Sequence, residues 1–268
     1  MLSRDEFDRA AQEALPKLRN VLRKMVGQRE QCDDLVQESL TKAWEHLASF
    51  QDKARFSTWL CAIAVNCAQD FLRSQQRWRG KAQIIYADQC IQHPELGMEV
   101  GQSFQDPAIS FDTKEHIAYC FSCVGRSLEP TQQAALVLKD VLEMTSMEAA
   151  RALGISEPVF RQHLTAARSA MQQQYEGMCA LVNKQGICYQ CAALREGFPE
   201  QRRDRWPLDD EQPLAFDLRV NMVREADIDC GKTQLLHEVF WRRTEQLERD
   251  GIGDESVQPD CSKGVATE

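Results

Sequence analysis

The sequence predicts an all-α protein with two helical domains, a linker between them and a C-terminal extension. Apolar residues recur at spacings of three and four over residues 1–82 and again over residues 112–175, as on the buried face of helices. Residues 83–111 lose this period and contain glycine and proline, which indicates a linker. Residues 176–268 hold cysteines, a polar stretch at 199–213, two predicted helices at about 215–228 and 232–249, and a polar tail.

In the first domain, two sets of apolar residues define helices on either side of the polar segment 49–55. The first set is Leu35, Val36, Leu40, Ala43, Trp44 and Leu47; we expect Leu35, Val36, Leu40 and Trp44 in the core. The second set is Phe56, Trp59, Leu60, Ile63, Ala64, Cys67, Phe71 and Leu72. Ser57 and Thr58 are predicted to cap the second helix.

The second domain contains the signals of a capped helix pair. Pro130 suits the first turn of a helix, and Thr145 with Glu148 has the spacing of a capping box. Gly154 suits a turn that needs a positive φ, and a further helix is predicted from Glu157 to about Gln174. A short helix, a glycine turn and a second helix predict a helix-turn-helix, although an ordinary pair of packed helices has the same pattern.

The charge of the chain is unevenly distributed along its 268 residues. The formal net charge is −9, made up of +3 over residues 1–82, −5 over 83–125, zero over 126–175 and −7 over 176–268. The acidic excess therefore lies outside the first domain, which can still present a local basic patch to phosphates. No apolar run is long enough to span a membrane and no secretory signal precedes the first helix, so we expect a cytoplasmic protein.

Three stretches together resemble bacterial RNA polymerase sigma factors of the extracytoplasmic-function (ECF) type. The stretch Asp33-Asp34-Leu35-Val36-Gln37-Glu38, followed by Ala43-Trp44, resembles their core-binding helix. Residues 56–66, FSTWLCAIAVN, resemble the segment that follows it. Residues 128–130 and 147–156 resemble their C-terminal helix-turn-helix. The resemblance covers about residues 5–80 and 112–175 and implies a two-domain sigma factor carrying an additional C-terminal module.

For the first domain, the resemblance implies one surface for polymerase and one for melted promoter DNA. Helical spacing places four polar residues on one stripe, and the resemblance assigns them to core RNA polymerase: Asp33, Asp34, Gln37 and Glu38. A solvated acidic face without a partner is the alternative. Asn66 is assigned to a flipped base, Arg73, Arg77 and Arg79 to phosphates, and Trp78 to stacking on a base.

For the second domain, the resemblance implies that the second helix of the helix-turn-helix enters the major groove at the −35 element. The candidate base-reading residues are Glu157, Arg161, Gln162, Thr165 and Arg168. The sequence departs from the family pattern here, because His163 and Ala166 stand where cations are usual. With zero net charge over residues 126–175, we expect this domain to bind DNA weakly when it is not docked on polymerase.

Eleven cysteines are many for a reducing compartment. Two CxxC pairs, Cys120 with Cys123 and Cys188 with Cys191, have ligand-like spacing and could together hold zinc. The 64 residues between them exceed the usual gap of a zinc ribbon. Three interpretations stay open: a structural zinc site, a sensor of metal or thiol oxidation, and simple packing. Cys32, Cys61 and Cys67 are predicted core residues.

We therefore predict a sigma factor that is not an enzyme and requires no cofactor. It would bind core RNA polymerase and promoter DNA, melting the −10 element with the first domain and reading the −35 element with the second. An anti-sigma factor, or inhibition by the chain's own extension, would restrain it. The main alternative is a stand-alone helix-turn-helix regulator responsive to metal or redox state; a dithiol oxidoreductase ranks below both, because the chain lacks a βαβ context.

Overall fold

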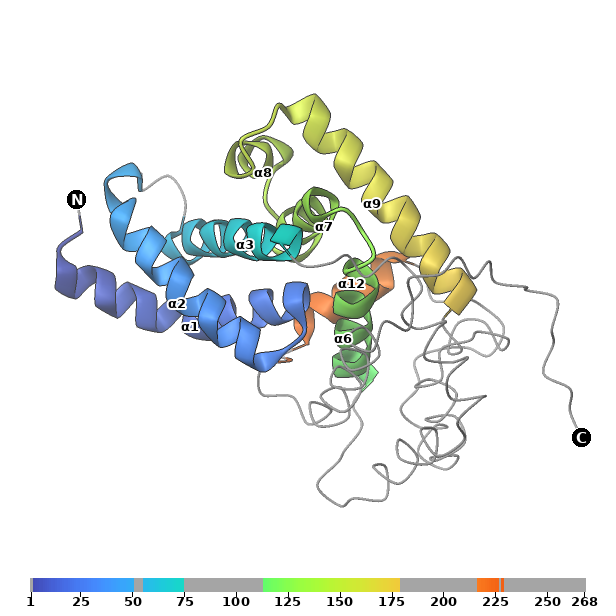
Figure 1. Ribbon diagram of the computed structural model, residues 1–268, viewed down its shortest axis with the longest axis horizontal. Helices are drawn as coiled ribbons and strands as arrows, with labels where there is room; N and C mark the ends of the chain where they lie inside the picture. Colours follow the sequence, from blue (N-terminus) through green and yellow to red (C-terminus); the bar gives the residue numbers. More distant parts are fainter. Residues whose placement is uncertain (1, 51–54, 75–112, 179–215, 227, 229–268) are drawn as a thin grey trace, which may run out of the picture.

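The computed structural model describes residues 2–50, 55–74, 113–178, 216–226 and 228. Every regular element within these ranges is a helix, and no strand occurs in them, as the sequence predicts. Figure 1 shows two groups of helices side by side, with one further helix of the C-terminal extension packed beside them. None of the helices in the described ranges has the length and apolar character needed to cross a membrane.

The first group consists of three long helices, α1 (Arg4–Val26), α2 (Arg29–Glu45) and α3 (Phe56–Ser74), with a short 3₁₀ turn at Leu47–Ser49. A capping box starts α1: the Ser3 hydroxyl accepts from the Glu6 N–H, and the Glu6 carboxylate accepts from the Ser3 N–H at 2.7 Å. Gly27 ends α1 with φ of 78°, a value that side chains disfavour. The three helices pack on one another around a common apolar core.

Two details of the first group differ from the sequence prediction. Helix α3 begins at Phe56, so Ser57 and Thr58 lie inside its first turn, where Thr58 donates its N–H to the carbonyl of Arg55. The prediction that they cap the helix was wrong. Trp44 is also not a core residue, because 44% of it is exposed. Its ring lies edge-on against that of Phe7, with the ring centroids 5.2 Å apart.

Leu35 and Val36 are buried and Leu40 is half-buried. Cys32, Cys61 and Cys67 lie in the core, as predicted. Burial raises the pKa of the Cys61 thiol to about 11, which keeps it protonated and unreactive at neutral pH. The core cysteines of this group therefore act as small apolar residues.

The second group contains α6 (Thr113–Gly125), α7 (Pro130–Leu136), a π-helical turn η2 (Val137–Val141), α8 (Ser146–Ala152) and α9 (Glu157–Met178). The predicted local signals are confirmed. Pro130 is the first residue of α7, Thr145 and Glu148 form the capping box of α8, and Gly154 has φ of 65°. The π-helical turn was not predicted, because an apolar stripe does not reveal a change in helical hydrogen bonding.

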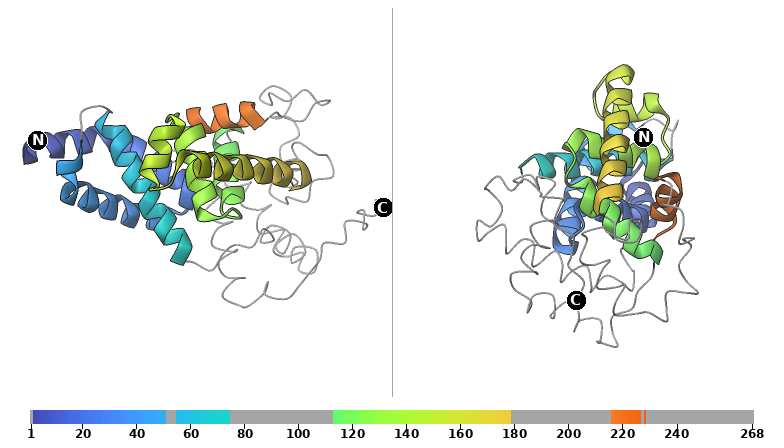
Figure 2. Two further views of the ribbon diagram at one scale, coloured as in Figure 1. Left: turned by 90° about the horizontal axis from the view of Figure 1, so that it is seen from above. Right: turned by 90° about the vertical axis from the view of Figure 1, so that its right-hand side faces the viewer.

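The two groups pack against each other and share one continuous apolar core. Helix α3 contacts α7 and α8, and α1 contacts α6 and η2. Figure 2 shows this arrangement from two further directions. Side chains of the second group also satisfy the end of α1: Ser122 donates to the carbonyl of Arg23 at 2.9 Å, and Gln133 to that of Met25 at 2.9 Å. Both carbonyls lie in the last turn of α1, and the Arg23 carbonyl also accepts from the N–H of Gly27 at 2.9 Å.

One helix of the extension, α12 (Phe216–Glu225), lies within the described ranges and confirms the first of its two predicted helices. It packs on α6 and η2 and buries an apolar face. The buried apolar residues of this segment are Val220, Val223, Ala226 and Ile228. The predicted linker at 83–111 and the second predicted helix at 232–249 lie outside the described residues.

His116 of α6 is buried beside α12, and this makes the stability of the fold depend on pH. Burial, together with the positive charge of Arg219, lowers the pKa of His116 to about 4. In an unfolded chain its pKa is about 6.5, so the unfolded state takes up a proton first as the pH falls. The stabilising contribution of the neutral imidazole is therefore complete above pH 6.5 and is lost between about 6.5 and 4.

We expect the free energy of unfolding to fall across this window by up to about 1.4 kcal/mol per pH unit beyond the slope of a chain without His116. Urea unfolding of the wild type and of His116→Gln at several pH values between 5 and 8 measures the difference. His46→Gln is the control, because His46 is exposed and should leave the slope unchanged. Identical slopes for wild type and His116→Gln would contradict the prediction.

Candidate polymerase and nucleic-acid interface

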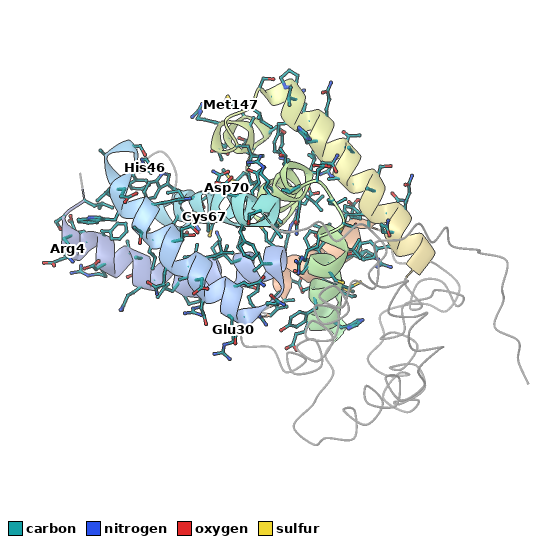
Figure 3. All side chains as sticks on the ribbon, viewed as in Figure 1. Arg4, Glu30, His46, Cys67, Asp70 and Met147 are labelled. Carbon is teal, nitrogen blue, oxygen red and sulfur yellow. The ribbon has the colours of Figure 1, made fainter. Side chains whose placement is uncertain are left out.

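The four residues predicted to bind polymerase lie together on α2. Asp34, Gln37 and Glu38 are exposed and Asp33 is half-buried. Asp33 pairs with Arg19 of α1, and Glu38 pairs with Lys42 one turn further on, at 2.7 Å. Glu30 and His46, labelled in Figure 3, mark the two ends of this helix. The acidic face of α2 is thus open to a partner, and its outer charges sit on a rigid, packed helix.

Asn66, the predicted base-reading residue of α3, lies at the contact between the two groups. Its amide donates to the carbonyl of Ala152 at 2.8 Å. Ala152 is the last residue of α8, so Asn66 satisfies a carbonyl that lacks an intrahelical donor. In this arrangement the amide donor of Asn66 is already used within the protein.

Arg73, a predicted phosphate contact, lies at the same interdomain contact. It donates to the hydroxyl of Thr131 in α7 at 3.2 Å and pairs with Asp70 on its own helix, which Figure 3 labels. Gln69 donates to the same Thr131 hydroxyl at 2.9 Å. The other predicted contacts in this region, Arg77, Trp78 and Arg79, lie outside the described residues.

A cluster of aromatic rings, which the sequence analysis did not single out as a site, covers the far end of the first group. Neighbouring ring centroids are 5.1–5.6 Å apart, and the guanidinium of Arg4 lies 5.8 Å from the Trp44 ring. The rings are Phe7, Trp44, Phe50, Phe56 and Trp59. Aromatic pairs of this kind are each worth about 0.5–1.5 kcal/mol beyond the area that they bury.

The second helix of the helix-turn-helix, α9, presents an exposed polar face. Glu157, Arg161, Gln162 and Thr165 are half-buried to exposed on this helix. Arg161 pairs with Glu157 one turn earlier, and the Thr165 hydroxyl donates to the carbonyl of Arg161 at 2.9 Å. The structure therefore brings these four predicted residues together on the helix that would enter a groove.

Arg168, the fifth predicted base-reading residue, lies in a different environment. Its guanidinium holds the carboxylate of Asp140 with two hydrogen bonds, of 2.9 and 2.5 Å. This hydrogen bonding raises the pKa of Arg168, and the Asp140 side chain is only 7% exposed. Arg168 thus ties α9 to η2, which fixes the direction in which the exposed face of α9 points.

Two exposed apolar residues of the helix-turn-helix were not among the predicted site residues. Met147 on α8 is 57% exposed and is labelled in Figure 3, and Val159 at the start of α9 is 39% exposed. Apolar side chains at the N-terminal end of a recognition helix can contact the methyl group of thymine. Sequence periodicity could have indicated Val159, because it lies three residues before Gln162 and helical spacing places the two on one face.

The described half of the predicted zinc site lies on α6. Cys123 is buried and Cys120 is half-buried. Across the described ranges no three residues of the types that bind metal form a cluster. The partners that a four-cysteine site would need, Cys188 and Cys191, lie outside the described residues, so the zinc site stays a prediction.

Comparison with known protein families identifies two domains in the chain. Residues 11–78 match sigma-70 region 2 and residues 123–171 match sigma-70 region 4. The first match spans the three-helix group and the second spans the helix-turn-helix with the helices that support it. In these two domains the chain is therefore similar to sigma-70 factors, and the relatives that it matches include ECF RNA polymerase sigma factors.

Among these relatives, the ECF RNA polymerase sigma factor SigG of Mycobacterium tuberculosis is 30% identical over 159 residues, which cover 56% of this chain and 43% of SigG. SigM of Bacillus subtilis is 26% identical, over 56% of this chain and 83% of SigM. This chain thus spans less than half of the length of SigG. A solved complex of the sigma factor RpoE with the anti-sigma factor NepR from Bartonella quintana is 21% identical and gives a TM-score of 0.40, covering 63% of this chain and 95% of RpoE.

Because Arg168 and Arg161 lie in different environments, we expect their replacement to change the free energy of unfolding by different amounts. Arg168→Ala leaves the buried Asp140 carboxylate without its bidentate partner, so we expect a loss of roughly 1–3 kcal/mol in the free energy of unfolding. Arg161→Ala is the matched control on the same helix, because its pair with Glu157 is exposed. It should change stability by no more than about 0.5 kcal/mol. Urea unfolding measures both, and equal losses would contradict the assignment of Arg168 to the fold.

Proposed function

We propose that the chain is a promoter-specific initiation factor in the cytoplasm that binds core RNA polymerase and carries no catalytic step of its own. The acidic face of α2 would bind polymerase, α3 would contact melted DNA at the −10 element, and α9 would read the −35 element. Region 2 would occupy residues 1–82 and region 4 residues 112–175, joined by a linker at 83–111 and followed by the extension at 176–268.

One observation carries this proposal: two separate interaction surfaces occur on one chain in the order that a sigma factor needs. An exposed acidic face lies on α2, and an exposed polar face lies on the second helix of a helix-turn-helix. An acidic face repels DNA, so it suits a protein partner, whereas the face of α9 carries side chains able to hydrogen-bond base edges.

The alternative function is that of a regulator whose helix-turn-helix binds DNA without polymerase. Such a protein needs phosphate contacts for affinity, and residues 126–175 carry zero net charge. The acidic face of α2 would also be without a role. Transcription from a promoter with purified core polymerase distinguishes the two, because only the initiation factor makes it promoter-dependent. Suitable promoters can be recovered by transcribing fragmented genomic DNA of the same organism.

The polymerase surface is tested by reversing its charge. Asp34→Lys together with Glu38→Lys should abolish co-purification with core polymerase, because complementary charge across an interface becomes repulsive. Both residues are exposed, so each change should alter stability by only about 0.5 kcal/mol or less. Asp8→Lys with Glu13→Lys on α1 is a control of equal charge at exposed positions. If the α2 variant still co-purifies as well as this control does, the surface is wrongly assigned.

The reading surface is tested by comparing promoters. Arg161→Ala should weaken the preference at one base pair of the −35 element by roughly 1–3 kcal/mol, if its guanidinium holds one base with two hydrogen bonds. The measurement is competitive transcription from promoters that differ at single positions. Gln173→Ala, exposed towards the far end of α9, is the control and should leave all preferences intact. An equal loss on every promoter would instead make Arg161 a phosphate contact.

A further inference from the structure

We propose that residues 216–226 and 228 of the C-terminal extension form an intramolecular clasp. It holds region 2 and region 4 closed on each other, and it must release before the chain can read a promoter. The clasp itself is a structural inference, and its regulatory consequence rests on the proposed function. No partner is required for the closed state, because the clasp is part of the chain.

The clasp contacts both domains through its C-terminal end. Asn20 of α1 donates to the carbonyl of Ala226 at 3.1 Å and accepts from the N–H of Ile228 at 3.3 Å. The Tyr119 hydroxyl of α6 donates to the carbonyl of Ile228 at 3.0 Å. One short stretch of backbone is thus bound by region 2 and by region 4 at the same time.

Helix α12 fastens the clasp to region 4. Arg224 donates to the carbonyl of Asp140 in η2 and pairs with Glu143 at 3.3 Å. Arg219 lies over the ring of Tyr175 in α9, 4.1 Å from its centroid. Val220 and Val223 of α12 are also buried. Helix α12 is therefore packed onto the protein through both polar and apolar contacts.

The closed arrangement prevents the two domains from reading a promoter together. The −10 and −35 elements lie about 25 base pairs apart, which is roughly 85 Å at about 3.4 Å per base pair. Asn66 of region 2 and Ala152 of the helix-turn-helix are joined by a hydrogen bond of 2.8 Å. The domains must separate before each can reach its own element, and separation also frees the Asn66 amide and Arg73.

The covalent connection between the domains permits such a separation. There are 38 residues between Ser74 and Thr113, and an extended chain of this length reaches roughly 125 Å. The restraint on opening is therefore noncovalent. It consists of the domain contacts and of the clasp that spans them.

The closed interface also contains a group that favours opening. Arg23 of α1 is 1% exposed and donates one hydrogen bond, of 3.2 Å, to the Tyr119 hydroxyl. Its Nε and Nη1 atoms are buried and make no hydrogen bond in the structure. A buried cation that is incompletely hydrogen-bonded is costly, and opening returns it to water. The closed state is therefore expected to depend on the additional contacts of the clasp.

The test removes the contacts of the clasp in the full-length chain without altering the core of either domain. Asn20→Ala removes both hydrogen bonds to the clasp and places a good helix former in α1, and Arg224→Ala removes its links to η2. The matched control is Gln12→Ala with Leu218→Ala, at exposed positions of the same two helices. Two measurements are made: the radius of gyration in solution by small-angle X-ray scattering, and run-off transcription at limiting chain with core polymerase.

We expect Asn20→Ala with Arg224→Ala to raise the ratio of open to closed chains roughly tenfold. The radius of gyration should increase and the transcript yield should rise several-fold, because the competent fraction sets the apparent affinity. The control should match the wild type in both. An unchanged radius of gyration would overturn the clasp, and opening without added transcript would overturn its regulatory role. If no chain supports transcription, the proposed function fails, and the scattering still decides whether the clasp exists.

Discussion

The hydroxyl of Tyr119 is the point at which three distant parts of the chain meet. It accepts a hydrogen bond from Arg23 of α1 and donates one to Ile228 of the extension, while its ring is buried in α6. Around it, the end of α1 is capped by Ser122 and Gln133 of region 4. The junction thus holds the two domains together at the end of α1, and further polar contacts between them, at Asn66 and Thr131, lie along α3.

The contacts at this junction contribute both favourably and unfavourably to the free energy of closing the two domains on each other. One apolar core runs through both domains, yet the same interface buries the Arg23 guanidinium with a single hydrogen bond. Apolar burial stabilises closure without specifying much geometry, whereas an incompletely satisfied cation limits how stable closure can become. Such a balance fits the proposed function, in which contacts within the chain are exchanged for contacts with polymerase and DNA, since a small change in free energy then shifts the population.

The helix-turn-helix shows a division between residues that build the surface and residues that face outward. Arg168 and Asp140 fix α9 against η2, while Glu157, Arg161, Gln162 and Thr165 stay on the outer face. Sequence reasoning placed all five residues of α9 in one group because they share a polar character. It could not separate Arg168 from the rest, since the carboxylate that holds it lies 28 residues away and belongs to a helix of a different kind.

The sequence by itself determined the helices and where most of them begin and end. Pro130, the Thr145–Glu148 box and Gly154 act through neighbours within one turn, so their effects can be read from spacing alone. Only the tertiary structure decided that Asn66 faces Ala152 and that Asn20 holds the extension, contacts between residues 86 and 206 positions apart. Helical periodicity shows which residues of a helix are apolar, but the partner of a polar residue depends on how whole helices pack, and no local pattern encodes that.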